Sequence, residues 1–436
     1  MRDMNNTKFK HTTVTAVVIA NMIGTGVFTS LGFQLLDIQS GFTILLLWVM
    51  GGIIALCGSI TYAELGAALP RSGGEYNFLS EIYHPCAGFI SGWVSATIGF
   101  AAPIALTAIT FSAYLASLFP EFDLPWVRQG IASALVLSLA IMHSSNRKNS
   151  GNLQVVFTIL KIAIIILFCT SALFFGKNLQ PISFAPSVND IDLILDGSFA
   201  ISLIYVSYAY TGWNAATYLS SEIENPQKNL PKILITGTTV VMLLYVLLNY
   251  VFLKVATIDS MQGKLEIGYI AAQSVFGDLG AKFTGLALAL LLISTVSAMT
   301  LAGPRVLQVI GEDFSVLNFL SKSNKDKIPT TAIYTQSTIA IIFILSSSFE
   351  SILIFAGFTL ALNSFATVMG VFFLRLKQPN IKRPYRIQAF PLPPLIYLSL
   401  TGWTLYFVIV NRPIEGLFSL AIIASGGLIY FISTKK

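Results

Sequence analysis

Long apolar runs recur along the whole chain, and they constrain its fold more than any other feature. Runs of about 18 or more such residues are candidates for membrane-spanning helices. Hydrophobic residues make up 55% of the 436 positions and charged residues only 11%, whereas soluble domains carry about 25% charged residues. Because a backbone in hydrocarbon must satisfy its own hydrogen bonds, the sequence predicts an all-α membrane protein.

The apolar runs predict twelve transmembrane helices. We place them at residues 13–35, 41–68, 86–117, 126–145, 151–175, 197–220, 231–255, 280–310, 330–348, 350–375, 390–410 and 414–433. An even number of spans puts both termini on the same side of the membrane. The distribution of Lys and Arg then predicts which side this is.

Most Lys and Arg residues fall on the side of the termini, which predicts cytoplasmic termini in the cell (inner) membrane. The residues on this side are Arg2, Lys8, Lys10, Arg71, Arg147, Lys148, Lys228, Lys232, Lys322, Lys325, Lys327, Arg375, Lys377, Lys382, Arg383, Arg386, Lys435 and Lys436. The opposite side holds Arg128, Lys177, Lys254, Lys264, Lys282 and Arg412. Because the net charge of +6 is dispersed over helix ends, it indicates contact with membrane lipid and not with nucleic acid.

Two predicted spans are interrupted by glycine near their middle. Residues 23–27 of the first span read Ile-Gly-Thr-Gly-Val, and residues 208–213 of the sixth read Tyr-Ala-Tyr-Thr-Gly-Trp. Either segment alone is also compatible with close helix packing through small residues. The two interruptions fall at matching places, one opening residues 13–175 and the other opening residues 197–375. This pairing favours a binding site between two inverted repeats.

A broken helix leaves unpaired N–H groups on one side of the break and unpaired carbonyls on the other, which attract anions and cations respectively. Two such breaks form a receptor for a zwitterion. The amides of Thr25, Gly26 and Val27 suit its carboxylate. The carbonyls of Ile23, Ala209 and Tyr210 suit its ammonium group. Gly212 is the glycine that interrupts the second helix and belongs to the same predicted site. The middles of the pocket helices carry no Asp or Glu, which favours a neutral side chain.

Lys161 is an ionisable residue deep in the fifth span, about 15 Å from the cytoplasmic end at 1.5 Å per residue. Because a charged side chain inside the membrane is costly, such a residue is first considered a candidate functional residue. Its ammonium group could replace a sodium ion, carry a proton, or simply tie the fifth helix to the broken carbonyls of the first. The three cysteines, Cys57, Cys86 and Cys169, lack CxxC spacing, and the sequence indicates no metal, cofactor or catalytic constellation.

Four motifs, in order along the chain, resemble those of the amino acid–polyamine–organocation transporters. They are Ile-Gly-Thr-Gly-Val-Phe at 23–28, the Glu-Leu…Pro-Arg-Ser-Gly-Gly-Glu-Tyr stretch at 64–76, Leu-Ala-Gly-Pro-Arg at 301–305, and Arg-Pro-Tyr-Arg at 383–386. The resemblance implies a LeuT-like fold, a five-plus-five inverted repeat with discontinuous first and sixth helices. Residues 1–386 would form this core, and residues 387–436 would add two C-terminal helices.

Within that family the chain is most similar to the L-type transporters and their bacterial serine/threonine- or alanine-exchanging relatives. Residues 208–214 and 225–231 carry their motifs, and Lys161 matches the lysine of their fifth helix. The resemblance implies sodium-independent exchange of neutral amino acids, and Gly26, Gly99, Ala101 and Ala102 favour small ones. It also implies a gating role for Tyr208, which aligns with an aromatic residue that covers the substrate in relatives; the alternative is an ordinary interhelical aromatic.

Several alternatives remain open at this point. Arg305 is either part of a cytoplasmic gate of ion pairs or a solvated helix-end residue. Asn214 stands where some proton-coupled relatives have Glu, yet a proton-coupled symporter of the same fold remains an alternative. An intramembrane enzyme or a channel is a more distant one. Animal L-type transporters bond a heavy subunit through a cysteine, but the loop at 117–126 has none, so no disulfide-linked partner is expected.

Overall fold

The apolar runs form helices, because helical backbone satisfies its own hydrogen bonds in a medium that offers none. The computed structural model describes residues 8–145, 150–176, 179–326 and 328–434. Seven of the basic residues used to predict the orientation lie outside these ranges, namely Arg2, Arg147, Lys148, Lys177, Lys327, Lys435 and Lys436. Within the described residues the only β contact is a single bridge between Phe9 and Ile223.

Ten helical segments in the described part of the chain are long and apolar enough to cross a membrane. Counted as one span, the pair α9 (Asn189–Leu195) and α10 (Gly197–Ala209), which is bent by 68°, is an eleventh. The apolar helix α14 (Thr330–Ser346) has 17 residues, fewer than these spans, and lies at the predicted ninth span. The fold class is confirmed as an all-helical membrane protein. The remaining spans are α1 (His11–Met22) with α2 (Gly26–Asp37), α3 (Gly41–Ala68), α5 (Pro85–Val94) with α6 (Ala101–Leu118), α7 (Pro125–Ser145), α8 (Ser150–Phe175), α11 (Pro226–Val255), α13 (Ile267–Asp313), α15 (Phe349–Lys377), α16 (Leu392–Asn411) and α17 (Pro413–Thr434).

Short helices connect the spans, and the apolar pattern did not predict them. They are α4 (Glu75–Ile82), α12 (Ile258–Met261) and three 3₁₀ turns at Pro120–Phe122, Ala215–Glu222 and Ser315–Ser321. The helix α13 also begins at Ile267, before its predicted start at residue 280, and it is kinked at Gly277. These segments are too short or too polar to give a transmembrane signal.

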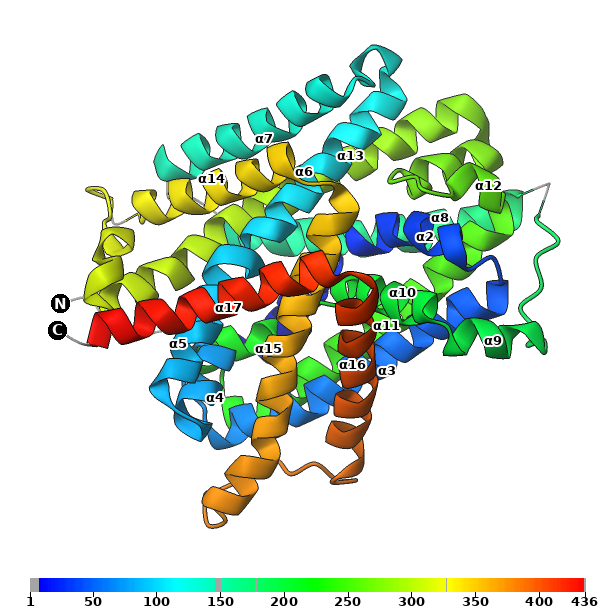
Figure 1. The fold of residues 1–436 in the computed structure, drawn as a ribbon. Coiled ribbons are helices and arrows are strands. Elements are labelled where there is room, and N and C mark those ends of the chain that lie inside the picture. Colours follow the sequence, from blue (N-terminus) through cyan, green and yellow to red (C-terminus); the bar gives the residue numbers. More distant parts are fainter. Residues whose placement is uncertain (1–7, 146–149, 177–178, 327, 435–436) are drawn as a thin grey trace.

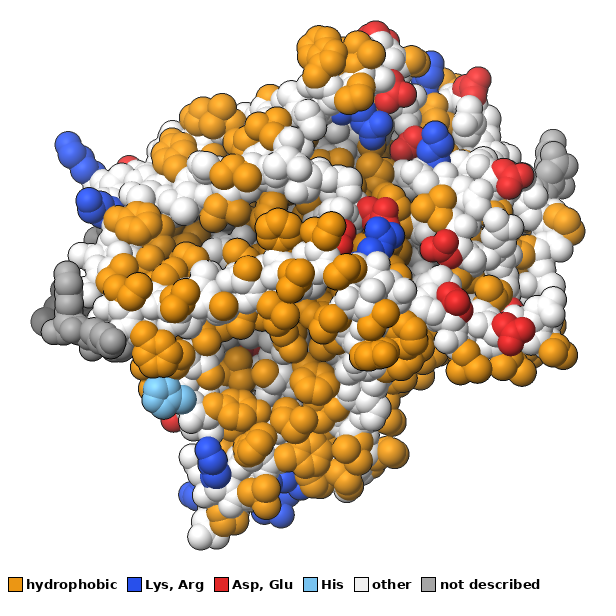
Figure 2. Space-filling view, viewed as in Figure 1, with side chains coloured by type: hydrophobic (Ala, Val, Ile, Leu, Met, Phe, Trp, Pro, Cys, Tyr) orange, Lys and Arg blue, Asp and Glu red, His pale blue; other side chains and the backbone are white. Residues whose placement is uncertain are grey.

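The spans divide into an inner group and an outer group. The apolar windows of the first, second and third spans are 72%, 61% and 67% buried, whereas those of α7, α8 and α17 are only 22%, 28% and 17% buried. Large hydrophobic side chains such as Leu167 and Phe174 on α8 and Phe418 on α17 are exposed. Figure 2 shows hydrophobic side chains over most of one face. The outer helices therefore present the surface that would contact lipid.

The described part of the chain begins and ends at the same end of the helical bundle, on the left of Figure 1. We call this end the terminal side and the other the opposite side. The twelve-span topology predicted this arrangement, since an even number of crossings returns the chain to the side where it started.

On the terminal side a buried carboxylate holds α3 against α15. Glu64 is 0% exposed, and it accepts hydrogen bonds from Arg375 Nε at 2.8 Å and Nη2 at 2.6 Å. Arg383 lies 3.7 Å away, and the backbone N–H of Ile387 donates at 2.8 Å. The guanidinium of Arg375 also lies 3.6 Å from the ring centre of Phe390. This set of contacts fixes the chain that follows α15 onto α3.

Replacing Glu64 with Gln should therefore destabilise the fold, because it leaves two guanidinium groups beside a neutral partner. Breaking a buried ion pair costs about 3–5 kcal/mol. Glu350→Gln is the matched control, since Glu350 pairs with Arg412 at 2.6 Å but both side chains are partly exposed, and exposed pairs contribute about 0–1 kcal/mol. Thermal unfolding in detergent should show a much lower midpoint for Glu64→Gln than for the control. Equal midpoints would contradict this assignment.

Candidate functional site

The first span loses its helical hydrogen bonding between α1 and α2. The amide of Gly24 donates back to the carbonyl of Met22 at 2.8 Å, and the amide of Phe28 donates to Thr25 at 2.9 Å. Among the described residues, no side chain caps the start of α2, so the amides of its first turn have no side-chain acceptor there. The N-terminus of a helix favours anions, because its free N–H groups and its dipole act together.

The sixth span breaks after Ala209 and continues as the 3₁₀ turn that begins at Ala215. Gly212 has a φ of +98°, a region that favours glycine. A Cβ at Gly212 would lie 2.9 Å from the backbone of Asn21. The second break therefore rests directly on the last turn of α1.

The two breaks also touch at Gly26. A Cβ at Gly26 would lie 2.6 Å from the Cα of Ala209, closer than van der Waals contact allows. Glycine is thus required by close approach, and the first turn of α2 lies against the last turn of α10. The sequence predicted that the two interruptions would lie together, and the structure brings them into contact.

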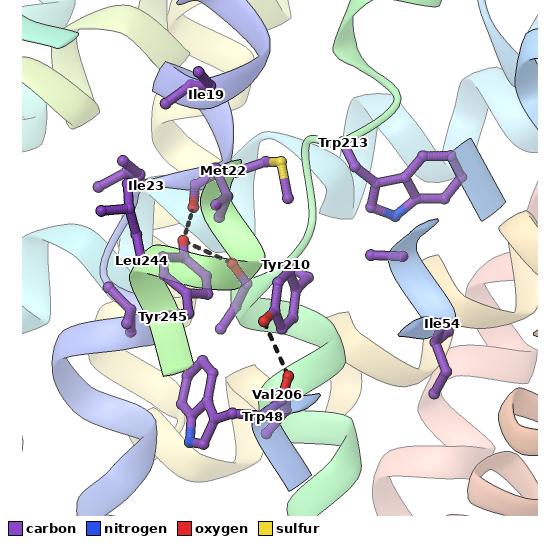
Figure 3. Packing of buried hydrophobic residues seen from close by; sticks show 14 of the residues in the cluster. Ile19, Met22, Ile23, Trp48, Ile54, Val206, Tyr210, Trp213, Leu244 and Tyr245 are labelled. Carbon is purple, nitrogen blue, oxygen red and sulfur yellow. Dashed lines mark hydrogen bonds between the residues drawn. The ribbon is translucent and has the colours of Figure 1, made fainter. Parts of the chain in front are cut away.

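A tyrosine from α11 joins the carbonyls at the two breaks. The hydroxyl of Tyr245 lies 2.5 Å from the carbonyl oxygen of Met22 and 3.2 Å from that of Ala209, as Figure 3 shows. Its ring packs against Trp48 and Tyr210, with ring centres 5.6 Å and 5.0 Å apart. One side chain therefore ties α11 to both interrupted spans.

Lys161 of α8 donates a hydrogen bond to a carbonyl at the first break. It is 5% exposed, and its Nζ donates to the carbonyl of Ile23 at 3.1 Å and to the hydroxyl of Thr295 at 2.8 Å. Ile23 and Thr295 both border a narrow cavity between the first, third, fifth and eighth spans, whose lining also includes Gly24, Phe28 and Tyr114. The ammonium group thus joins α8 to the break in the first span and to α13.

The other predicted residues lie in varied surroundings. Tyr208 is 5% exposed and packs in a cluster with Phe358 of α15. The hydroxyl of Tyr210 points into the core and donates to the carbonyl of Trp48 at 3.0 Å. Arg305 is exposed and forms no ion pair within 4 Å in the part of the chain that the structure describes. The structure therefore provides no ion-paired gate at Arg305 among these residues.

The third span contains a π-helical turn, Ser95–Gly99, between α5 and α6. Such turns occur mostly as single insertions and often at functional sites. After the turn, Ala102 belongs to the buried cluster that contains Tyr208, whereas Ala101 belongs to the cluster that contains Ala132 and Val136 of α7. Of the small residues predicted near the pocket, Ala102 therefore shares a cluster with residues of the sixth span, and Ala101 does not.

Sequence reasoning missed Tyr245, Thr295 and the π-helical turn. A tyrosine or threonine in an apolar helix carries no signal of its own, because its significance depends on which carbonyl or ammonium group it faces. Among the described residues, no group of three or more His, Cys, Asp or Glu side chains could hold a metal ion.

Known proteins match almost the whole chain. The family model described as amino acid permease matches residues 9–433. The large neutral amino acids transporter small subunit 2 of Rattus norvegicus is 28% identical over 437 residues, covering 95% of this chain and 78% of the relative. The b(0,+)-type amino acid transporter 1 and the Asc-type amino acid transporter 1 of Mus musculus are each 27% identical. Each match covers 95% of this chain, with 85% and 79% of the respective relatives covered.

The contact at Gly26 gives a direct test of the site. Gly26→Leu should abolish substrate uptake while leaving membrane insertion intact, because the added side chain must push α2 away from α10. Gly130→Leu is the control, since a Cβ at Gly130 would meet nothing within 4 Å. Uptake by both variants, together with their amounts in the membrane, measures the effect. Near-normal uptake by Gly26→Leu would show that the two breaks need not touch.

Proposed function

We propose that this chain, which belongs to the amino acid permease family, carries neutral L-amino acids across the cell membrane by alternating access, exchanging one for another without sodium. The observation that carries the proposal is the contact between two glycine-interrupted spans at Gly26 and Ala209. Beside that contact, the buried ammonium group of Lys161 lies on the Ile23 carbonyl. Free amides suit the carboxylate of an amino acid, and broken-helix carbonyls suit its ammonium group. The fixed cation takes the place that a sodium ion would need.

The proposed binding mode places the substrate carboxylate at the amides of Thr25, Gly26 and Val27, which start α2. The substrate ammonium group would bind carbonyls at the breaks. The Ile23 and Ala209 carbonyls already accept from Lys161 and Tyr245, but each carbonyl oxygen has two lone pairs. Substrate binding therefore adds a second donor to these oxygens, and Tyr208 would close over the bound molecule.

A neutral substrate side chain is supported by the cavities beside the breaks. Among the described residues that line the first cavity, Lys161 alone is charged. The second cavity lies between α3, α10, α15 and α16, and its described lining, which includes Ser207, Thr211 and Ser364, contains no charged residue. The name of the rat relative refers to large neutral amino acids. We favour small neutral substrates because of Gly26 and Ala102, so substrate size is the finer point for experiment.

Neutral amino acids should compete with a labelled substrate better than charged ones do. Arginine would bring a second cation beside Lys161 without a carboxylate to pair it, and glutamate would find its side-chain carboxylate unpaired in an apolar lining. The measurement is uptake of labelled alanine or serine into liposomes containing purified protein, with each unlabelled amino acid in excess. Competition by arginine equal to that by alanine would refute the charge argument.

Sodium independence is supported by the place of Lys161. An ammonium group among the carbonyls of a broken helix occupies the electrostatic niche that a sodium ion would need. Two like charges about 4 Å apart repel by about 4 kcal/mol at an effective dielectric of about 20. Lysine and sodium should therefore exclude one another.

Replacing sodium by choline should leave uptake unchanged, and Lys161→Ala should cripple transport in a protein that still folds. The physical reason is the loss of the side-chain donor to Ile23 and of the link to Thr295. Lys282→Ala is the matched control, because Lys282 is exposed on α13. A strict sodium requirement in the native protein would refute the proposal. Wild-type rates for Lys161→Ala would show that the ammonium group is dispensable.

Exchange and symport are distinguished by preloading. An exchanger takes up labelled substrate only into liposomes that contain an amino acid, whereas a proton-coupled symporter also fills empty liposomes along a proton gradient. We further propose that the terminal side is cytoplasmic and that transport needs no disulfide-linked subunit. Of the cysteines, Cys57 and Cys169 are buried, and Cys86 lies at the start of α5 rather than in the loop before α7.

A further inference from the structure

Three carboxyl groups are buried in the part of the chain that the structure describes, and their partners differ in kind. Glu64, Glu75 and Asp190 are 0%, 2% and 3% exposed. Glu64 is surrounded by guanidinium groups and a backbone N–H, which can only donate. Asp190 accepts from hydroxyls and from the backbone N–H of Ser187 at 2.6 Å. Each of these two acids has at least one partner that cannot accept a proton in return.

Glu75 differs, because each of its hydrogen-bond partners among the described residues can reverse its role. The hydroxyl of Tyr62 lies 3.0 Å from Oε1, and the hydroxyl of Tyr218 lies 2.5 Å from Oε2. The side-chain amide of Asn214 also bonds Oε1. Hydroxyls donate and accept, and an amide has a donor end and an acceptor end. The three hydrogen bonds therefore persist whether the carboxyl group is ionised or protonated.

No cation compensates Glu75 within 4 Å in the described residues. The titratable groups that face it are Tyr62 of α3, Tyr218 and, farther away, Tyr397 of α16. The basic residues of α15, which packs against α4, are engaged elsewhere. Arg375 pairs with Glu64, and Lys377 donates to the carbonyl of Ile82 at 3.4 Å.

The next residue, Tyr76, points away from this group. Its hydroxyl donates to Asp313 at 2.9 Å. Burial raises the pKa of Tyr76 to about 12, so its phenol stays neutral at ordinary pH. Tyr76 therefore adds no charge beside Glu75.

The partners of Glu75 come from two distant parts of the chain. Tyr62 and Glu75 belong to the first half of the chain, whereas Asn214 and Tyr218 follow Gly212 in the sixth span. Gly74 has a φ of +55°, and a Cβ there would lie 2.7 Å from the ring of Tyr218. The tight turn at 73–74 is therefore shaped to receive this tyrosine.

Two further contacts hold the segment after the second break in place on the terminal side. The hydroxyls of Ser72 and Ser221 lie 2.5 Å apart, and Phe9 bridges Ile223. The Glu75 cluster, meaning Glu75 with Tyr62, Asn214 and Tyr218, thus exists only while the segment after the second break lies against this turn. Moving that segment away from the turn would take the cluster apart.

We propose that Glu75 is a proton-binding site whose occupancy controls opening of the terminal side during transport. The proton comes from water on the terminal side, forms an O–H bond on a carboxyl oxygen, and returns to that water on release. The ionised carboxylate accepts three charge-assisted hydrogen bonds, which are about twice as strong as neutral ones. Protonation replaces them with weaker neutral bonds, so less free energy is needed to move the segment after the second break away from Glu75. The regulatory role rests on the proposed transport function, whereas proton binding itself does not.

Glu75→Gln is the central variant, because the Gln amide keeps the shape and both hydrogen-bonding roles of the protonated acid. Glu81→Gln is the matched control, since Glu81 lies on the same helix but is exposed. We expect the wild-type exchange rate in liposomes to depend on pH, by at most tenfold per pH unit, which is the limit for one protonation site. Glu75→Gln should hold the wild-type low-pH rate at every pH, and Glu81→Gln should follow the wild type.

A direct readout separates the proton site from the transport function. The infrared difference spectrum of the purified protein between low and high pH should contain the C=O stretch of a buried carboxylic acid, which histidines do not give. Glu75→Gln should lose this band, and Glu81→Gln should keep it. Tyr218→Phe, which removes one donor, should shift its midpoint by about one pH unit, that is, tenfold in proton affinity.

Several results would overturn the inference. They are retention of the band by Glu75→Gln, a wild-type pH profile of exchange in that variant, or an unchanged midpoint in Tyr218→Phe should Glu75→Gln fail to fold. A wild-type protein that carries no amino acid at any pH would instead refute the proposed function, and the infrared band would still decide whether Glu75 binds the proton.

Discussion

The carbonyl groups freed at the two helix breaks are the constraint on which the rest of the structure depends. In an apolar surrounding an unsatisfied backbone group costs several kcal/mol, so each break needs donors from elsewhere in the fold. Lys161 supplies one from α8, and Tyr245 supplies another from α11. These donors fix how α8 and α11 pack around the interrupted spans. The breaks thus organise the bundle that surrounds them.

Two kinds of polar contact divide the work on the terminal side. Around Glu64, charged and backbone donors hold α3, α15 and the following loop in one arrangement. Around Glu75, hydroxyl and amide groups join segments that belong to different halves of the chain. A fixed ion pair suits a part that stays still, whereas exchangeable hydrogen bonds suit a part that separates in each transport cycle. Both carboxylates come from the single stretch at 64–76.

Long-range hydropathy and the positions of glycine made much of the fold predictable from the sequence. The predicted span 41–68 coincides with α3, and the interruptions at 23–27 and 208–213 fall where α1 and α10 end. The depth of Lys161 was readable because a charge in an apolar run is conspicuous. Tyr245 was not, since its role depends on carbonyls that lie 223 and 36 residues away in the chain. The short helices α4 and α12 gave no signal, because too few residues define their faces.

The π-helical turn at Ser95–Gly99 has a consequence for how the third span is compared with other proteins. One extra residue in a helical turn rotates everything after it by about 100° around the helix axis. After the turn, Ala102 belongs to the buried cluster that contains Tyr208, and Ala101 belongs to the cluster that contains Ala132 of α7. A homologue without the extra residue would present a different column of side chains to the neighbours of α6. An alignment without a gap at this turn would then pair positions that lie on different faces of the helix.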